Sequence, residues 1–246
     1  GSYQLIRFEL STGDSQIIGN IGTNEAVLSL HFERSSQRLI AALNSGSSIR
    51  LVSLNPSTAV PTEIHSGISD CCILQPSVSA LNNGMLFLSG RLTTDPVTTR
   101  RLIGLSTSGD NSITMPLFSE SLAALVEDPA NGMLYGLSQT TTAPPSTSSI
   151  QLIQINNDGS TVNVGSAVND CCAMALDMAT ISNGILIAVG LNQGDTDFSI
   201  FSFDLQSGIL GISSGNLANN LIVNHLFDEL KGLIPTTTVI DSVLPN

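Results

Sequence analysis

Ser69–Gly90, SDCCILQPSVSALNNGMLFLSG, aligns without a gap with Asn169–Gly190, NDCCAMALDMATISNGILIAVG. Each stretch begins with an Asp-Cys-Cys triplet and continues with an apolar run, an Asn-Gly pair and a second apolar run. An Asn-Gly pair between short apolar runs is typical of the turn of a β-hairpin. The chain therefore contains a duplicated unit in which the same predicted hairpin follows the same pair of cysteines.

Short runs with alternating apolar and polar residues continue on both sides of these hairpins. They include YQLIRFEL (Tyr3–Leu10), SIRLVSL (Ser48–Leu54), SIQLIQI (Ser149–Ile155) and FSIFSFDL (Phe198–Leu205). A period of two residues indicates a strand, and turn-forming segments such as NPSTAV and STSGDNS separate the runs. The sequence thus predicts an all-β protein.

Four predicted strands, which we call a to d, recur in the same order along the chain. The four full copies begin near Ala26, Val78, Leu122 and Leu176. Their spacing of roughly 50 residues is the length of a four-stranded propeller blade. The repeats therefore predict a β-propeller.

The two ends of the chain complete the count of blades. Tyr3–Gly22 supplies only strands c and d, and Leu221–Thr237 supplies only strands a and b. We predict a five-bladed β-propeller whose last blade is closed by two strands from each terminus, because such a closure leaves no open sheet edge. It would be a single domain with blades at about 24–73, 74–121, 122–174, 175–220, and 221–246 together with 1–23.

Several of these segments resemble the repeats of secreted β-propeller proteins. The resemblance is in LIRFELSTGDSQIIGNIG followed by VLSLHFERSSQRLIAAL, and in LAALVEDPANGMLYGL. It covers nearly the whole chain and implies the propeller fold. It does not imply one activity, since propellers of this kind bind, scaffold or catalyse.

The composition excludes several classes of partner. The formal charge of -12 repels polyanions, so we expect no nucleic-acid partner. No apolar run approaches the roughly 20 residues that span a bilayer, so we expect no membrane insertion. The chain could still be one part of a larger extracellular protein.

Three acids occupy the same position at the end of predicted strand a: Glu33, Glu127 and Asp228. They could surround one mouth of the channel and take part in carboxylate chemistry. They could equally accept hydrogen bonds from the following turn, as the sequence EDPANG suggests, and we favour this structural role. We assign no catalytic residue.

The three histidines, His31, His65 and His225, have no spacing that would gather metal ligands. A single histidine on a strand is usually accommodated by its neighbours, so we assign these three no role. No Gly-x-Ser-x-Gly motif marks a nucleophilic serine. We expect neither a metal nor a cofactor.

The four cysteines allow three interpretations. They could be free apolar residues, thiolate ligands of a metal, or disulfides. Adjacent cysteines lack the two-residue spacer of a zinc site, and pairing between the doublets would have to bridge two blades. We therefore favour vicinal disulfides, Cys71–Cys72 and Cys171–Cys172, which predict an oxidising compartment and hence an extracellular, secreted protein.

Both doublets lie in the predicted connections from strand d to strand a, which we expect to surround the channel mouth. There each disulfide would present an apolar sulfur surface beside an acid. The predicted binding residues are Asp70, Cys71, Cys72, Asp170, Cys171 and Cys172.

These features favour a non-catalytic binding, scaffold or adhesion module. Its partner would be a protein, a small molecule or a glycan. A hydrolase or lyase that uses carboxylates at the channel mouth is the alternative, and a lectin is a third interpretation, limited by the 4% aromatic content.

Overall fold

The computed structural model describes residues 3–9, 11–21, 25–44, 48–69, 73–96, 99–109, 111–116, 121–141, 148–169, 171–192, 198–217 and 242–245. Every helix or strand in these residues is a β-strand. The prediction of an all-β protein is therefore confirmed.

Sixteen of the strands form four antiparallel sheets of four strands each. The first sheet contains β3 (Ala26–Glu33), β4 (Arg38–Asn44), β5 (Ser48–Leu54) and β6 (Pro61–Ser69). The second contains β7 (Ile73–Asn82), β8 (Met85–Arg91), β9 (Arg101–Ser106) and β10 (Ser112–Thr114). The third contains β11 (Ser121–Glu127), β12 (Leu134–Thr141), β13 (Ser148–Ile155) and β14 (Thr161–Val168). The fourth contains β15 (Cys172–Ser182), β16 (Ile185–Asn192), β17 (Phe198–Asp204) and β18 (Leu210–Leu217).

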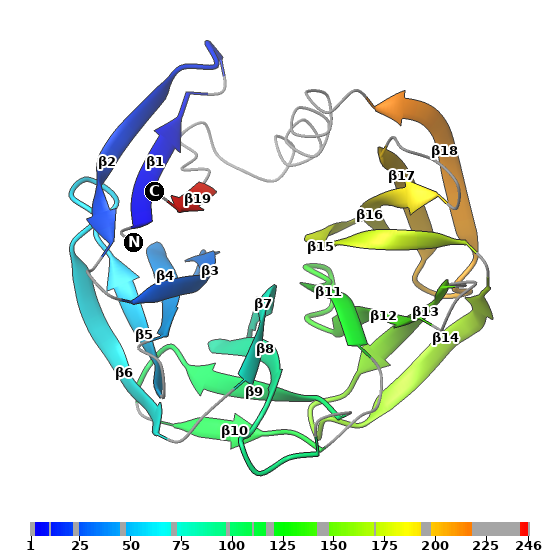
Figure 1. Ribbon diagram of the computed structural model, residues 1–246, viewed down its shortest axis with the longest axis horizontal. Coiled ribbons are helices and arrows are strands. Elements are labelled where there is room, and N and C mark those ends of the chain that lie inside the picture. The colour runs from blue at the N-terminus through cyan, green and yellow to red at the C-terminus, as the bar shows by residue number, and fades with distance from the viewer. Residues whose placement is uncertain are drawn as a thin grey trace.

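These sheets stand in a propeller-like ring (Figure 1). The first strand of each sheet, β3, β7, β11 or β15, lies innermost, and the last strand lies at the outer edge. Strand β7 contacts β3, β11 and β15, and β11 also contacts β15. The ends of these four inner strands therefore meet around the axis of the ring.

The prediction of five complete blades is wrong for the part of the chain that the structure describes, which contains four four-stranded sheets. The remaining strands form a sheet of three, in the order β19 (Ser242–Pro245), β1 (Tyr3–Phe8) and β2 (Ser15–Ile21). The N-terminus supplies two of these strands, as expected, and β19 from the C-terminal end occupies the free edge of β1. The predicted strands a and b at Leu221–Thr237 lie outside the described residues, so the two-plus-two closure is not supported.

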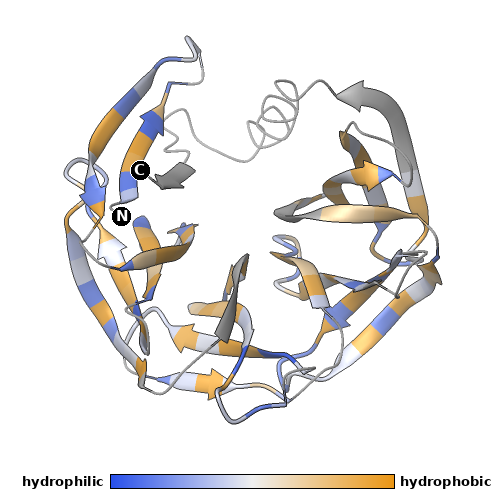
Figure 2. Cartoon of the chain, in the orientation of Figure 1, coloured by the Kyte–Doolittle hydropathy of each residue, from blue (hydrophilic) through white to orange (hydrophobic). Residues whose placement is uncertain are grey.

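The apolar core lies between neighbouring sheets. Ile49 and Leu51 of the first sheet pack with Leu86 and Ile103 of the second, and equivalent clusters join the second to the third and the third to the fourth. A further cluster joins Leu5 of the three-stranded sheet to the first sheet. Apolar and polar residues alternate along the strands (Figure 2). Because the first, second and third sheets each pack against a neighbour on both sides, burial of apolar side chains holds these sheets together.

Candidate functional site

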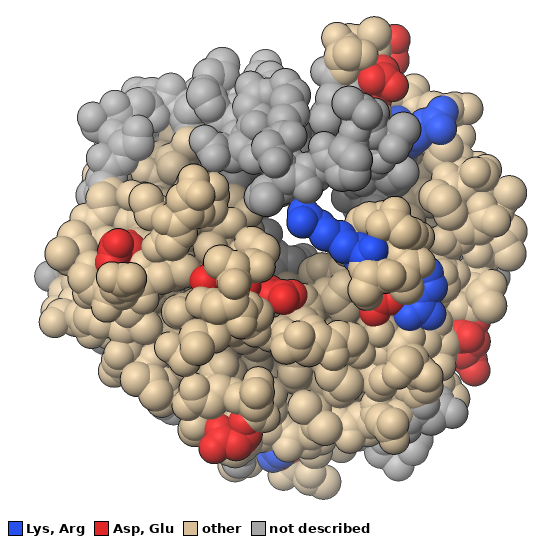
Figure 3. Space-filling view, turned by 180° about the vertical axis from the view of Figure 1, so that it is seen from behind, with Lys and Arg blue, Asp and Glu red and all other residues tan. Residues whose placement is uncertain are grey.

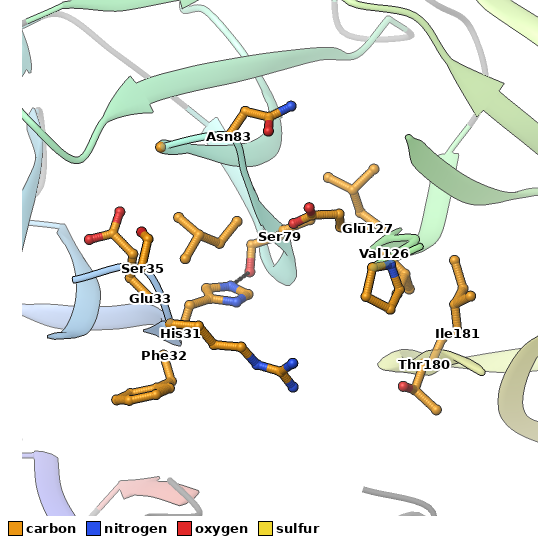
Figure 4. A pocket seen from close by; sticks show the side chains of 17 residues that line it. His31, Phe32, Glu33, Ser35, Ser79, Asn83, Val126, Glu127, Thr180 and Ile181 are labelled. Carbon is orange, nitrogen blue, oxygen red and sulfur yellow. Dashed lines mark hydrogen bonds between the residues drawn. The ribbon is translucent and has the colours of Figure 1, made fainter. Parts of the chain in front are cut away.

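A cavity of about 870 Å³ lies where the innermost strands end (Figure 4). It is formed by the last residues of β3, β7, β11 and β15 and by the turns that lead to the second strands. Its wall includes His31, Glu33, Arg34, Ser79, Glu127 and Thr180. Of the predicted binding residues, Cys171 and Cys172 are described; they lie at the start of β15, whereas the cavity is lined by Ala179, Thr180 and Ile181 near its end.

Glu33 at the end of β3 serves as an internal tie between two sheets. Its carboxylate is buried and accepts hydrogen bonds from Ser36, from Thr107 in the turn that follows β9 of the second sheet, and from Arg38, whose Nη2 lies 2.6 Å away. Burial alone would raise the pKa of Glu33, but the hydrogen bonds from Ser36, Thr107 and Arg38 hold it below its ordinary value. The predicted structural role is confirmed for this acid.

Glu127 at the end of β11 has different surroundings. The turn that follows is held by its neighbour Asp128, whose Oδ1 accepts from the Ala130 amide at 3.0 Å and whose carbonyl accepts from the Gly132 amide at 2.8 Å. Glu127 is half-buried in the cavity wall and accepts no hydrogen bond from any described residue. Its predicted turn-bonding role is therefore wrong.

Burial raises the pKa of Glu127, while the positive charge of Arg34 acts in the opposite direction. The third acid of this set, Asp228, lies outside the described residues. Of the two described acids, Glu127 is thus the one that is available to a ligand.

Arg34 begins the turn between β3 and β4, and its side chain is exposed at the cavity. It has no ion pair with any described acid within 4 Å. In the space-filling view, a basic group reaches the central opening from the side of β3 and an acidic group from the side of β11 (Figure 3). The mouth therefore holds charges of both signs.

His31 and Ser79 form a pair that the sequence analysis did not anticipate. His31 Nε2 and Ser79 Oγ are hydrogen-bonded at 2.8 Å across the boundary between β3 and β7 (Figure 4). Burial lowers the pKa of His31 to about 4, so the imidazole is neutral at pH 7. The position of His31 two residues before Glu33 was a usable signal, because alternate residues share a face, but the register shift between Leu74 and Ser79 in β7 concealed its partner.

Cys171 and Cys172 form the predicted vicinal disulfide. The exposed fractions of the two residues are only 7% and 2%, and both belong to the apolar cluster between the third and fourth sheets. Ser148 of β13 accepts from the Cys171 amide through its carbonyl and donates to the Cys172 carbonyl through its hydroxyl. The expected exposed sulfur surface is therefore wrong for this doublet, because the disulfide packs at the joint between two sheets.

The other predicted site residues, Asp70, Cys71, Cys72 and Asp170, lie outside the described residues. A binding role for the six predicted residues as a group stays a prediction.

In the residues that the structure describes, no group of three or more histidine, cysteine, aspartate or glutamate side chains is arranged to hold a metal ion. The same residues include no helix with the length and apolar character needed to cross a bilayer.

No protein-family model and no curated protein sequence matches the chain. Solved structures with a similar arrangement include an oligogalacturonate lyase in complex with manganese (TM-score 0.55, 12% identity, 89% of this chain and 63% of that chain). TolB from Acinetobacter baumannii is similar with a TM-score of 0.54 and 11% identity, over 89% of this chain and 54% of that chain. A puromycin hydrolase is similar with a TM-score of 0.53 and 13% identity, over 82% of this chain and 33% of that chain.

This chain spans less than two thirds of the length of each of these three proteins. At such low identity the likeness establishes the propeller fold and nothing about activity.

Proposed function

We propose that this protein is a binding module that holds a small polar molecule in the cavity at the ends of β3, β7, β11 and β15. The observation that supports this most directly is Glu127, a half-buried carboxylate that faces the cavity and accepts no hydrogen bond from the described residues. Its carboxylate faces the cavity and is not one of the fully buried polar groups without a partner, so a ligand that enters the cavity can bond to it directly.

The size and lining of the cavity support the same proposal. A volume of about 870 Å³ lies within the range of roughly 300–1,000 Å³ that is usual for small-molecule sites. The wall combines apolar side chains such as Leu81, Val126 and Ile181 with a few polar ones. This mixture suits an organic molecule with a small number of hydrogen-bonding groups.

A carboxylate-based hydrolase or lyase is the second candidate, and the raised pKa of Glu127 favours it, since such a group can act as a general acid. Mechanisms with two carboxylates need a second free acid. Glu33 does not meet this need, because it is occupied by Ser36, Arg38 and Thr107. This is why binding without turnover is the preferred proposal.

We also propose that the protein is a secreted β-propeller protein. The Cys171–Cys172 disulfide supports an oxidising compartment. Non-reducing peptide mapping of the protein from its native source tests this proposal. We expect both doublets to be oxidised, and free thiols at Cys171 and Cys172 would argue against secretion.

A second surface, formed by the connections that contain Asp70 and Asp170, is retained as a proposed site for a protein or glycan partner. The double variant Asp70→Ala, Asp170→Ala should lower the affinity for such a partner and leave the affinity for a ligand of the cavity unchanged. If the affinity for a ligand depends on these two aspartates, its binding site is the surface formed by the connections that contain Asp70 and Asp170, and not the cavity.

The test of the cavity is a thermal-shift screen of small polar molecules against the wild type and two variants. Thr180→Trp places a large side chain in the cavity, and Thr62→Trp makes the same change at an exposed position of β6, away from the cavity. We expect compounds that stabilise the wild type to stabilise Thr62→Trp equally and to lose their effect on Thr180→Trp. Stabilisation that survives in Thr180→Trp would overturn the proposal.

A further inference from the structure

We propose that the ligand of this cavity is a small zwitterion of the amino-acid class, with its ammonium group on Glu127 and its carboxylate on Arg34. This inference rests on the proposed binding role of the cavity. It identifies the chemical class of the ligand from Arg34 and Glu127, two opposite charges that act on each other across the cavity but form no ion pair or hydrogen bond through their side chains.

Three charged side chains line the cavity, Glu33, Arg34 and Glu127. Glu33 is already neutralised by Arg38, whose Nε and Nη2 lie 3.1 Å and 2.6 Å from its Oε2. Arg34 and Glu127 have no hydrogen bond or ion pair from their side chains to any other described residue. The cavity thus offers one positive and one negative group for a ligand.

The two free charges come from different parts of the ring. Arg34 follows β3, Glu127 ends β11, and the second sheet, with β7, lies between these strands. Figure 3 shows a basic and an acidic group approaching the opening from these two sides. A single ligand that bonds to both side chains must therefore carry a positive charge for Glu127 and a negative charge for Arg34.

Apart from its three charged side chains, the cavity wall is uncharged. The low pKa of His31 leaves the imidazole uncharged at pH 7, and it is hydrogen-bonded to Ser79. Thr180, Leu81 and Val126 add a hydroxyl and apolar surface. A ligand with two opposite charges and an otherwise uncharged body fits this lining.

A ligand with one charge would satisfy only half of the site. A simple amine would pair with Glu127 and leave Arg34 unmatched, whereas a simple carboxylate would also be repelled by the net charge of -12. An amino acid has no net charge and can form a charge-assisted hydrogen bond at each end. The site therefore favours the zwitterion over both of its halves.

Isothermal titration with four matched probes tests the inference: γ-aminobutyrate, butylamine, butyrate and butyramide. We expect the zwitterion to bind the wild type at least about tenfold more tightly than each of the other three. Glycine and ε-aminocaproate extend the series, and the best chain length reports the separation of the two charges. Equal affinity for butyramide and the best zwitterion, or no binding of any zwitterion, would overturn the inference.

Two variants assign the ends of the ligand. Glu127→Gln should reduce the affinity for γ-aminobutyrate to that for butyrate, and Arg34→Gln should reduce it to that for butylamine. Arg7→Gln, at an exposed position of β1, and Glu9→Gln, just beyond β1, are matched controls. Neither should change the affinity for γ-aminobutyrate. Glu127→Asp keeps the charge, and retained binding by this folded variant would support the assignment. Unchanged zwitterion affinity in both glutamine variants would contradict it.

The failure of this inference can be told apart from failure of the proposed function. If a neutral compound binds the wild type more tightly than any zwitterion and Thr180→Trp abolishes this binding, the cavity is a binding site but the inference of a zwitterionic ligand is wrong. Thr180→Trp that leaves γ-aminobutyrate binding intact would remove both proposals.

Discussion

Glu33 and Glu127 occupy equivalent places at the ends of β3 and β11, yet their neighbours give them different roles. Glu33 is followed by a turn that returns Ser36 and Arg38 to its carboxylate. Glu127 is followed by Asp128, which takes over the hydrogen bonds of the turn. In one turn the acid at the end of the strand accepts the hydrogen bonds, and in the other turn the next residue accepts them. Glu33 is therefore a structural acid, whereas Glu127 is available to a ligand.

We expect Glu33→Gln to lower the free energy of unfolding by about 1–3 kcal/mol, because it removes the charge that Arg38 and Thr107 depend on. The pKa of Glu33 is lowered in the folded protein, so this stabilisation is present above the pKa of the unfolded chain and is lost as the pH falls through the folded value. Urea unfolding at several pH values measures it. The difference between wild type and variant should shrink below about pH 4, and a constant difference, or an equal loss in Glu9→Gln, would contradict the role of Glu33.

His31 provides a second prediction at this scale. Its pKa of about 4 means that the unfolded chain binds a proton before the folded chain does, so the free energy of unfolding falls as the pH drops from about 6.5 towards 4. His31→Gln should lose less stability over this range than the wild type. An NMR titration of the His31 ring checks the pKa directly, and a midpoint near 6.5 would show that burial does not keep the ring neutral.

Individual site residues were the least predictable part of this protein. The acids at the ends of strand a could be found by aligning the repeats, but the sequence could not show which of them were already bonded. The His31–Ser79 pair depends on how two sheets are placed beside each other and on a register shift within β7. Neither feature has a local pattern in the sequence.

The strands themselves follow from local patterns. Alternating apolar residues and Asn-Gly or Gly-containing turns predicted the hairpins, and Asn83 with Gly84 and Asn183 with Gly184 all have positive φ in the structure. The C-terminal end of the chain does not follow this rule. The sequence predicts the closing strands at Leu221–Thr237, whereas the strand that pairs with β1 is β19, at Ser242–Pro245. A strand of four residues is too short to have a recognisable period.

The register shifts of β6 depend on one glycine. Gly67 has a φ of 99°, and a Cβ at this position would lie 1.8 Å from the carbonyl oxygen of Ile49 on β5. We expect Gly67→Ala to lower the free energy of unfolding by about 3 kcal/mol or more, through both backbone strain and displacement of β5. Gly13→Ala, with a φ of 78° but open space around the Cβ, should cost only about 1 kcal/mol. Equal losses in the two variants, measured by urea unfolding, would show that the close approach to β5 is not what requires glycine.

On the scale of the whole molecule, the ring is built from contacts between neighbouring sheets. The three-stranded sheet packs Leu5 and Ile21 against Leu39 and Val52 of the first sheet, and it includes strands from both ends of the chain. The period of the repeats predicted the ring and its four-stranded sheets. It could not predict the cavity, because a cavity depends on which side chains meet from four strands that are distant in the sequence.

Deletion of residues 1–22 tests the contribution of the N-terminal strands. It removes β1 and β2, exposes the apolar face around Leu39 and Val52, and leaves β19 without its partner. We expect the truncated protein to lose its cooperative thermal transition, as followed by circular dichroism. A truncated chain that melts like the intact protein would show that the ring does not need these strands.

The measurement that tests the central claim most directly is an NMR titration of alanine methyl groups with γ-aminobutyrate. Ala80 and Ala179 line the cavity, whereas Ala59 is buried between the three-stranded sheet and the first sheet, away from it. The methyl signals of Ala80 and Ala179 should shift and saturate together, while the signal of Ala59 stays unchanged. Saturable shifts at Ala59 with none at Ala80 and Ala179, or no shift at any of the three, would contradict the claim that the ends of the innermost strands form the ligand site.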